Sequence, residues 1–264
     1  IKYYKLAINK NPNNFQAYNN LGISLHENGN SEEAIQYIKK SIELTPNYAE
    51  AYNNLGNILK ETGQLQESIS NYKKSLELQP NAFTTNNNIG LVYNDLDDSK
   101  NAIKFFKKSI SINPQFAEAY NNLGKTFENI GEIDSAIDNY EKALSCNSKF
   151  PSALNNLGNC LEEKSDFIGA QQKFKQAISI DKNFAEAHFN FGTNLMLFED
   201  FKNGLNEMEW RFKTKIWNNK YSQLFPKPKW NGKEFKNKTL FLETILFSWK
   251  FNILNFIYIF INST

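Results

Sequence analysis

Asparagine recurs in this sequence at a fixed spacing of 34 residues, as from Asn20 to Asn54, and its amide can make directed contacts. One column of these residues is unbroken and comprises Asn20, Asn54, Asn88, Asn122, Asn156 and Asn190. The position before it holds Asn19, Asn53, Asn87, Asn121, Asn155 and then Phe189. A carboxamide offers two N–H donors and one acceptor oxygen. A row of such amides can therefore hold the main chain of an extended peptide without reading its side chains.

Two explanations of these columns stay open, because the chain is rich in asparagine throughout. Asparagine is a mediocre helix former, so helix propensity does not explain a fixed place inside a helix. We predict that the unbroken column binds peptide, with its side chains exposed and not paired with other side chains. For the column before it, a solvated flank or amides that hydrogen-bond the neighbouring unit are the favoured interpretations.

Metal, cofactor and nucleophile chemistry are not indicated. Cys146 and Cys160 have no metal-ligand spacing, and no histidine cluster completes one. We interpret both as small, half-buried apolar residues in a reducing compartment. His188 stands where the repeat otherwise has tyrosine and is expected in the core, whereas His26 is expected to be an exposed helix residue without a partner. No phosphate-binding loop is present, so we predict no enzymatic activity, no metal and no cofactor.

Charge and composition exclude several classes of partner. The formal net charge is +2 and 22% of residues are charged, which lacks the basic excess typical of nucleic-acid or membrane-surface binding. The 41% of hydrophobic residues are enough for a core. The expected partner is a protein or an extended peptide, with no nucleic acid, no small-molecule substrate and no membrane.

The same period determines the expected fold. Six pairs recur in phase: Leu21-Gly22, Leu55-Gly56, Ile89-Gly90, Leu123-Gly124, Leu157-Gly158 and Phe191-Gly192. Within each unit, apolar residues at helical spacing predict two helices. Gly29, Gly63 and Gly131 are suited to the left-handed turn between them. Asn30 followed by Glu33 has a capping-box spacing, and Asp98, Asp166 and Asp200 occupy the same cap position as Asn30.

A repeat of this length is that of a tetratricopeptide unit. We therefore expect an all-α, right-handed superhelix of about six helical hairpins, with a concave groove lined by the first helix of each unit. The units are 15–48, 49–82, 83–116, 117–150, 151–184 and 185–213. Residues 1–14 fit the second helix of a truncated preceding repeat. The absence of an initiator Met indicates that the true N-terminus is missing, and a cytoplasmic location is expected.

The unit that begins Ala49-Glu-Ala-Tyr-Asn-Asn-Leu-Gly-Asn-Ile-Leu-Lys resembles the repeats of protein O-GlcNAc transferase and its bacterial relatives. This resemblance implies that the unbroken asparagine column lines the superhelix and holds substrate peptides. Tetratricopeptide domains of co-chaperones are a rival resemblance, in which paired basic residues hold a terminal carboxylate. Here the thirteenth and second positions are largely acidic, as in Glu61 and Glu50, and these carboxylates would repel an acidic tail.

The repeat pattern degrades in the sixth unit, where Gly204 replaces the usual Ala and Trp210-Arg211 follows. The sequence then resembles the closing helix and linker (214–239) of bacterial tetratricopeptide proteins that continue into a glycosyltransferase-like domain. For the hydrophobic tail 240–264, three interpretations stay open: a membrane helix, a small buried cap, or the remnant of a lost catalytic domain. The favoured function is a peptide-binding scaffold, the recognition arm of a glycosyltransferase-like protein. The alternative is a fragment of a protein O-GlcNAc transferase that lacks its catalytic domain.

Overall fold

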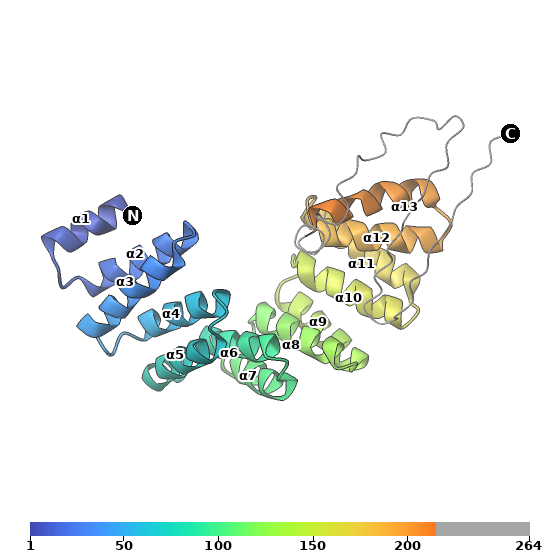
Figure 1. Ribbon diagram of the computed structural model, residues 1–264. Coiled ribbons are helices and arrows are strands. Elements are labelled where there is room, and N and C mark those ends of the chain that lie inside the picture. Colours follow the sequence, from blue (N-terminus) through green and yellow to red (C-terminus); the bar gives the residue numbers. More distant parts are fainter. Residues whose placement is uncertain (215–264) are drawn as a thin grey trace, which may run out of the picture. The chain divides into compact units, whose positions relative to one another are not determined.

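The computed structural model describes residues 1–214, and these residues form thirteen α-helices and one short 3₁₀-helix without a β-strand (Figure 1). The first helices of the hairpins are α2 (Phe15–Glu27), α4 (Ala49–Glu61), α6 (Phe83–Asp95), α8 (Ala117–Asn129), α10 (Pro151–Glu163) and α12 (Ala185–Leu197). The second helices are α3 (Ser31–Leu44), α5 (Leu65–Leu78), α7 (Ser99–Ile112), α9 (Ile133–Cys146), α11 (Phe167–Ile180) and α13 (Phe201–Met208). Helix α1 (Lys2–Lys10) precedes them, and η1 (Glu209–Lys213) follows. The expected all-α superhelical repeat is confirmed.

A left-handed residue joins the two helices of every hairpin. Backbone φ is positive at Gly29, Gly63 and Gly131, at 79° to 84°. In the other three turns Asp97, Ser165 and Glu199 take φ values of 57° to 63°. Such a residue ends a helix, because the backbone N–H groups at the helix end can then donate to carbonyl groups of the last turn. For example, Gly63 N–H donates to the Lys60 carbonyl at 3.0 Å.

The helices of a hairpin approach each other at a glycine that faces a large side chain. A Cβ added at Gly56 would lie 2.6 Å from Cε1 of Tyr72, and one at Gly90 would lie 2.6 Å from Cε1 of Phe106. Since the Tyr72 and Phe106 rings are fully buried, no side chain larger than hydrogen fits opposite them. The recurring glycine of the sequence therefore marks the crossing point of each helix pair.

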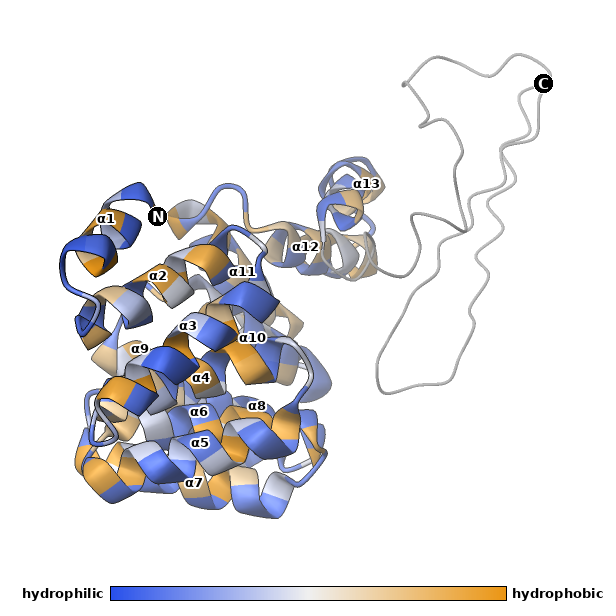
Figure 2. Cartoon of the chain, turned by 60° about the vertical axis from the view of Figure 1, so that its left-hand side comes forward, coloured by the Kyte–Doolittle hydropathy of each residue, from blue (hydrophilic) through white to orange (hydrophobic). Residues whose placement is uncertain are grey.

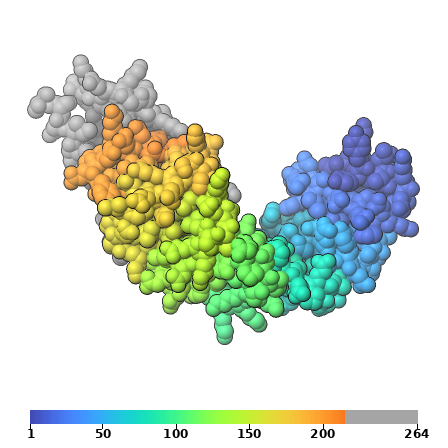
Figure 3. All heavy atoms as spheres, turned by 180° about the vertical axis from the view of Figure 1, so that it is seen from behind, coloured from blue at the N-terminus to red at the C-terminus, as the bar shows by residue number. Residues whose placement is uncertain are grey.

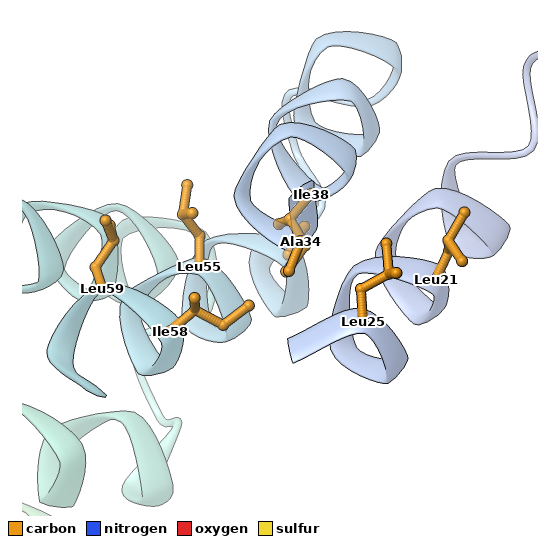
Figure 4. Close-up of a cluster of buried hydrophobic side chains, with 8 residues drawn as sticks. Leu21, Leu25, Ala34, Ile38, Leu55, Ile58 and Leu59 are labelled. Carbon is orange, nitrogen blue, oxygen red and sulfur yellow. The ribbon is translucent and has the colours of Figure 1, made fainter. Parts of the chain in front are cut away.

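Adjacent hairpins share clusters of buried side chains. In the first cluster, Leu21 and Leu25 of α2 and Ile38 of α3 pack with Leu55 and Leu59 of α4 (Figure 4). Hydrophobic and hydrophilic residues alternate along the helices, as Figure 2 shows, so each helix has an apolar face to bury. One hairpin cannot cover these faces alone, and the stack is the unit of stability.

The N-terminal helix caps predicted from the sequence are present in three hairpins, and one predicted cap is absent. The side chains of Asp98, Asp166 and Asp200 accept hydrogen bonds from backbone N–H groups three residues ahead. Asn30 is also an N-cap residue, but its side chain makes no capping bond. The capping box predicted from Asn30 and Glu33 is thus wrong. Glu33 instead contacts Lys5 of α1, with 3.8 Å between Oε1 and Nζ.

The last hairpin is irregular, as the degraded repeat predicts. Helix α13 ends at Met208, and the chain continues as the 3₁₀-helix η1, which carries Trp210. The Trp210 ring stacks on His188 of α12, with ring centroids 4.0 Å apart. His188 is buried, as expected, so an aromatic pair fills the space between these elements.

Most of the linker and the whole of the tail lie at residues 215–264, outside the described part of the chain. The three interpretations of the tail therefore concern residues that the structure does not describe. Among residues 1–214, no helix is both long enough and apolar enough to cross a bilayer.

Candidate functional site

The concave side of the repeat stack is lined by the first helices. Successive first helices contact one another along the whole series, from α2 with α4 to α10 with α12. Successive second helices, such as α3 and α5, make no such contact within the described residues. Because the first helices are closer together than the second ones, residues 1–214 must curve toward the first helices. Figure 3 shows the hollow on one side of this curved stack.

The six predicted ladder residues, Asn20, Asn54, Asn88, Asn122, Asn156 and Asn190, lie at the sixth position of the six first helices. All six side chains are half-buried. The structure therefore brings the column together on the series of helices that lines the groove, and we refer to it as the amide ladder.

The ladder residues are hydrogen-bonded to the preceding hairpin. Asn54 Nδ2 donates to Asn19 Oδ1 at 3.1 Å, and Asn122 Nδ2 donates to Asn87 Oδ1 at 3.0 Å. The same bond recurs from Asn156 to Asn121 at 3.2 Å and from Asn190 to Asn155 at 2.9 Å. Each of these bonds reaches back 35 residues, which is one repeat and one position.

One rung differs in its acceptor. Asn53 Oδ1 accepts from the Thr85 hydroxyl at 3.0 Å, and Asn88 Nδ2 donates to Asn57 Oδ1 at 3.0 Å instead. Tyr72 also donates to Asn57, through its hydroxyl at 2.7 Å. The ladder is thus continuous although the partner position changes.

These bonds correct one sequence prediction and decide another. The ladder side chains were expected to be exposed and unpaired, and this is wrong: five of the six donate to an asparagine of the hairpin before. The sixth, Asn20, accepts from Asn19 Nδ2 at 3.2 Å. The preceding column contains the buried acceptors, with Asn19 fully buried and Asn87 and Asn155 each 6% exposed. Its second interpretation, amides that bond the neighbouring hairpin, is confirmed.

Pairing leaves part of each ladder amide available. In Asn54, Asn122 and Asn156 one N–H is used by the bond to the preceding hairpin, while the second N–H and the two lone pairs of Oδ1 remain. Asn190 Nδ2 donates both to Asn155 and to Asn159, so its Oδ1 is the part that remains. For Asn54, Asn122 and Asn156 the structure gives Oδ1 no donor among the described residues. The bond also fixes the rotation of the amide, so the remaining donor and acceptor are held in place before any ligand arrives.

The histidines have structural roles. His26, expected to be exposed and without a partner, instead lies 2.9 Å from the Ser31 hydroxyl through Nδ1 and 2.9 Å from Glu61 Oε2 through Nε2. His188 lies between the Glu207 carboxylate and the Lys182 carbonyl oxygen. Sequence spacing did not indicate His26 as a link between hairpins, since its partner belongs to the next repeat. Within the described part of the chain, no group of three metal-ligating side chains occurs.

Models of the tetratricopeptide repeat match residues 13–81, 47–115, 117–150 and 139–172, which together cover more than half of the chain. The chain belongs to the tetratricopeptide-repeat family. Its described residues are accordingly a repeat scaffold of the protein-binding type, in which no catalytic domain is evident.

Solved tetratricopeptide-repeat structures resemble the chain over most of their length. MamA is 28% identical, with a TM-score of 0.55, over 62% of this chain and 96% of MamA. Pseudomonas aeruginosa PilF has a TM-score of 0.67 at 19% identity, over 80% of this chain and 92% of PilF. YrrB, a TPR protein with an unusual peptide-binding site, has a TM-score of 0.52 at 22% identity, over 70% and 95%. At identities of 19% and 22%, the likeness to PilF and YrrB shows the fold alone. No curated protein sequence matches the chain.

Proposed function

We propose that the chain binds an extended peptide segment of another protein in its groove, through the amide ladder. The observation that carries this proposal is the recurrence of a fixed, partly unused amide on every first helix. An extended peptide presents main-chain N–H and C=O groups at regular intervals. A ladder amide with one free N–H can accept from one of these groups and donate to another, as Asn122 and Asn156 would from neighbouring hairpins.

Several rungs must act together to give useful affinity. A hydrogen bond contributes about 0.5–1.5 kcal/mol net, so a single rung gives almost no binding. Three rungs that each make two bonds correspond to several kcal/mol, or about two to four orders of magnitude in the dissociation constant. Main-chain contacts carry little sequence information, so the ladder alone binds many peptides.

The test compares two triple variants of the full chain. Asn88→Ala, Asn122→Ala and Asn156→Ala together remove three rungs. The matched control, Asn87→Ala, Asn121→Ala and Asn155→Ala, removes the acceptors of Asn122, Asn156 and Asn190 but leaves all six ladder amides in place. Fluorescence polarisation with a degenerate library of labelled peptides measures binding, and thermal melts measure stability.

We expect the ladder variant to lose binding by at least about a hundredfold, whereas the control retains most of its affinity. Both variants should melt at lower temperature, because each breaks three bonds between hairpins, two of which, Asn122 to Asn87 and Asn156 to Asn121, are common to both. Equal affinity of the ladder variant and the wild type would show that the amides only join hairpin to hairpin.

We further propose that this scaffold is the recognition arm of a glycosyltransferase-like protein in the cytoplasm. This part of the proposal rests on the sequence resemblance of the unit at 49–68 and of the segment after Met208. This chain, purified alone, should transfer no sugar from a nucleotide donor to a peptide. Transfer by this chain, measured with a radiolabelled donor, would contradict the assignment as a recognition arm.

A further inference from the structure

Carboxylates border the amide ladder on the same face of the first helices. Positions 2, 6, 9 and 13 of each helix are separated by four, three and four residues, and this spacing places them in one stripe. On α4 the stripe consists of Glu50, Asn54, Asn57 and Glu61. The bond from Asn88 to Asn57 and the contact of Glu61 with His26 show that this stripe also faces the neighbouring hairpins.

The acidic residues recur along the whole groove. At the second and thirteenth positions, the carboxylates of the stripe are Glu27, Glu50, Glu61, Asp95, Glu118, Glu163 and Glu186. The same stripe has one cationic residue among the described helices, Lys125, whose Nζ is 2.8 Å from Glu128 Oε1. The ladder is thus flanked by negative charge at both ends of its helices.

This acidity belongs to the groove and is not a property of the whole chain. The first helices α2 to α12 carry nine carboxylates and two lysines, whereas α1 and the second helices carry fifteen lysines and nine carboxylates. The formal net charge of the full chain is +2. Charge is therefore separated between the concave and convex sides of the stack.

Most of these carboxylates are available to a ligand. Glu61 contacts His26, and Glu50 accepts from the Tyr48 hydroxyl at 2.9 Å. For Glu27, Asp95, Glu118 and Glu186, the structure has no ion pair with another described residue. Glu27, Asp95 and Glu118 are exposed, and Glu186 is half-buried.

We propose that the groove selects cationic peptide segments in which lysine or arginine occupies every third position. This inference rests on the proposed function and adds side-chain selection to it. Packed helices are about 8–10 Å apart, so successive stripes recur at about that distance. Three residues of an extended polyproline-type chain advance about 9.3 Å. One cationic side chain per three residues therefore meets the carboxylates of one hairpin, while the ladder holds the main chain between them.

The test uses the full chain and four synthetic peptides of equal length. In the first, lysine occupies every third position among serines. The second has the same composition with its lysines grouped at one end, the third has glutamate in place of lysine, and the fourth has alanine. Isothermal calorimetry at low ionic strength measures their dissociation constants. A repeat at about 0.5 M salt shows how far charge contributes, since the screening length then falls to a few ångströms.

A charge-matched pair of variants distinguishes the effect of the groove carboxylates on binding from the effect of the net charge. The groove variant combines Glu27→Gln, Asp95→Asn, Glu118→Gln and Glu186→Gln. The control variant combines Glu32→Gln, Glu43→Gln, Asp138→Asn and Glu141→Gln, which lie on second helices. Both raise the net charge by the same amount and leave every ladder residue intact.

We expect the periodic lysine peptide to bind at least about tenfold more tightly than the alanine and glutamate peptides. The groove variant and high salt should abolish this preference, and the control variant should keep it. Equal binding of the lysine and alanine peptides would overturn the inference but not the proposed function. Equal binding of the periodic and grouped lysine peptides would overturn the three-residue spacing. If none of the four peptides binds at millimolar concentration, the proposed function fails as well.

Discussion

Three rungs of the ladder join a groove-lining amide to a buried one, namely Asn54 to Asn19, Asn122 to Asn87 and Asn190 to Asn155. The donor, for example Asn122, retains contact with the groove, while its acceptor Asn87 is almost completely enclosed. An enclosed acceptor that loses its donor cannot turn to water, and the desolvation penalty is then not offset. The side chain that we propose to bind the peptide is therefore also a determinant of stability.

Asn122→Ala should consequently lower the free energy of unfolding by about 1–2 kcal/mol, although alanine is the better helix former. Urea denaturation followed by circular dichroism measures the change. Asn129→Ala on the same helix is the control, because Asn129 is exposed at the last residue of α8. If Asn122→Ala were as stable as the wild type, the hydrogen bond to Asn87 would contribute nothing.

Glu162 offers a second test with a definite pH dependence. Burial raises the pKa of its carboxyl group above the usual range, and the hydrogen bond that Asn194 donates partly offsets the rise. For an acid with a raised folded-state pKa, stability is greatest below the unfolded-state pKa and falls as the pH rises through the folded-state value. Glu162→Gln removes this loss of stability at higher pH, because glutamine does not ionise, and it retains an acceptor for Asn194 Nδ2.

The Glu162→Gln variant should therefore melt at a higher temperature than the wild type near pH 7. The difference should vanish below about pH 4, where the wild-type carboxyl is protonated in both states. Differential scanning calorimetry across this range measures it. Glu32→Gln, at an exposed site on α3, should show neither effect.

Residue types and spacing predict the two asparagine columns but not their pairing. Adjacent positions on an α-helix differ by about 100° around its axis, so the fifth and sixth residues face different neighbours. Which of them turns toward the preceding hairpin depends on the angle between successive repeats, and no local pattern encodes that angle. For the same reason the contact of His26 with Glu61 could not be predicted.

At the scale of the hairpin, the contact between glycine and a ring determines how closely two helices pack. The pattern of glycine and large residue is visible in the sequence, and three of the six left-handed turns follow from local chemistry, because they have a glycine. The turns at Asp97, Ser165 and Glu199 could be placed only by their phase in the repeat. The winding of η1, which brings Trp210 onto His188, has no counterpart in the other units and could not be predicted.

Gly124→Ala tests this close approach. The added Cβ would lie 2.8 Å from Tyr140 Cε1 and 3.2 Å from the Ala136 carbonyl oxygen, so the helices must separate or the ring must move. We expect a loss of about 1–3 kcal/mol in unfolding free energy. The double variant Gly124→Ala with Tyr140→Ala measures the coupling in a mutant cycle. Purely additive losses would mean that the Tyr140 ring does not oppose the new methyl group.

At the scale of the whole molecule, contacts among the described helices join each hairpin only to its neighbours in the chain. The stability of residues 1–214 is then approximately a sum of hairpin and interface contributions. Among the described residues, each cluster of buried side chains joins helices of neighbouring repeats. No long-range closure between the first and last hairpins contributes.

Deletion of residues 240–264 should therefore leave the melting temperature of the repeats almost unchanged. Solubility should improve, because the removed segment is rich in Phe, Ile and Leu. Thermal melts by circular dichroism and light scattering of the full and shortened chains measure the two properties. A large drop in melting temperature would indicate that the segment caps the last hairpin.

The backward reach of the ladder bonds also bears on how such a protein changes over evolutionary time. Asn122 and Asn156 occupy the same place in successive units, and each donates to the unit before it. If recombination removed residues 117–150, Asn156 would stand where Asn122 stood and would find Asn87 as its acceptor. Duplication of the same segment would insert one more rung in register. Unequal crossing-over can thus lengthen or shorten the groove one unit at a time, and every intermediate gene still encodes a complete row of amides.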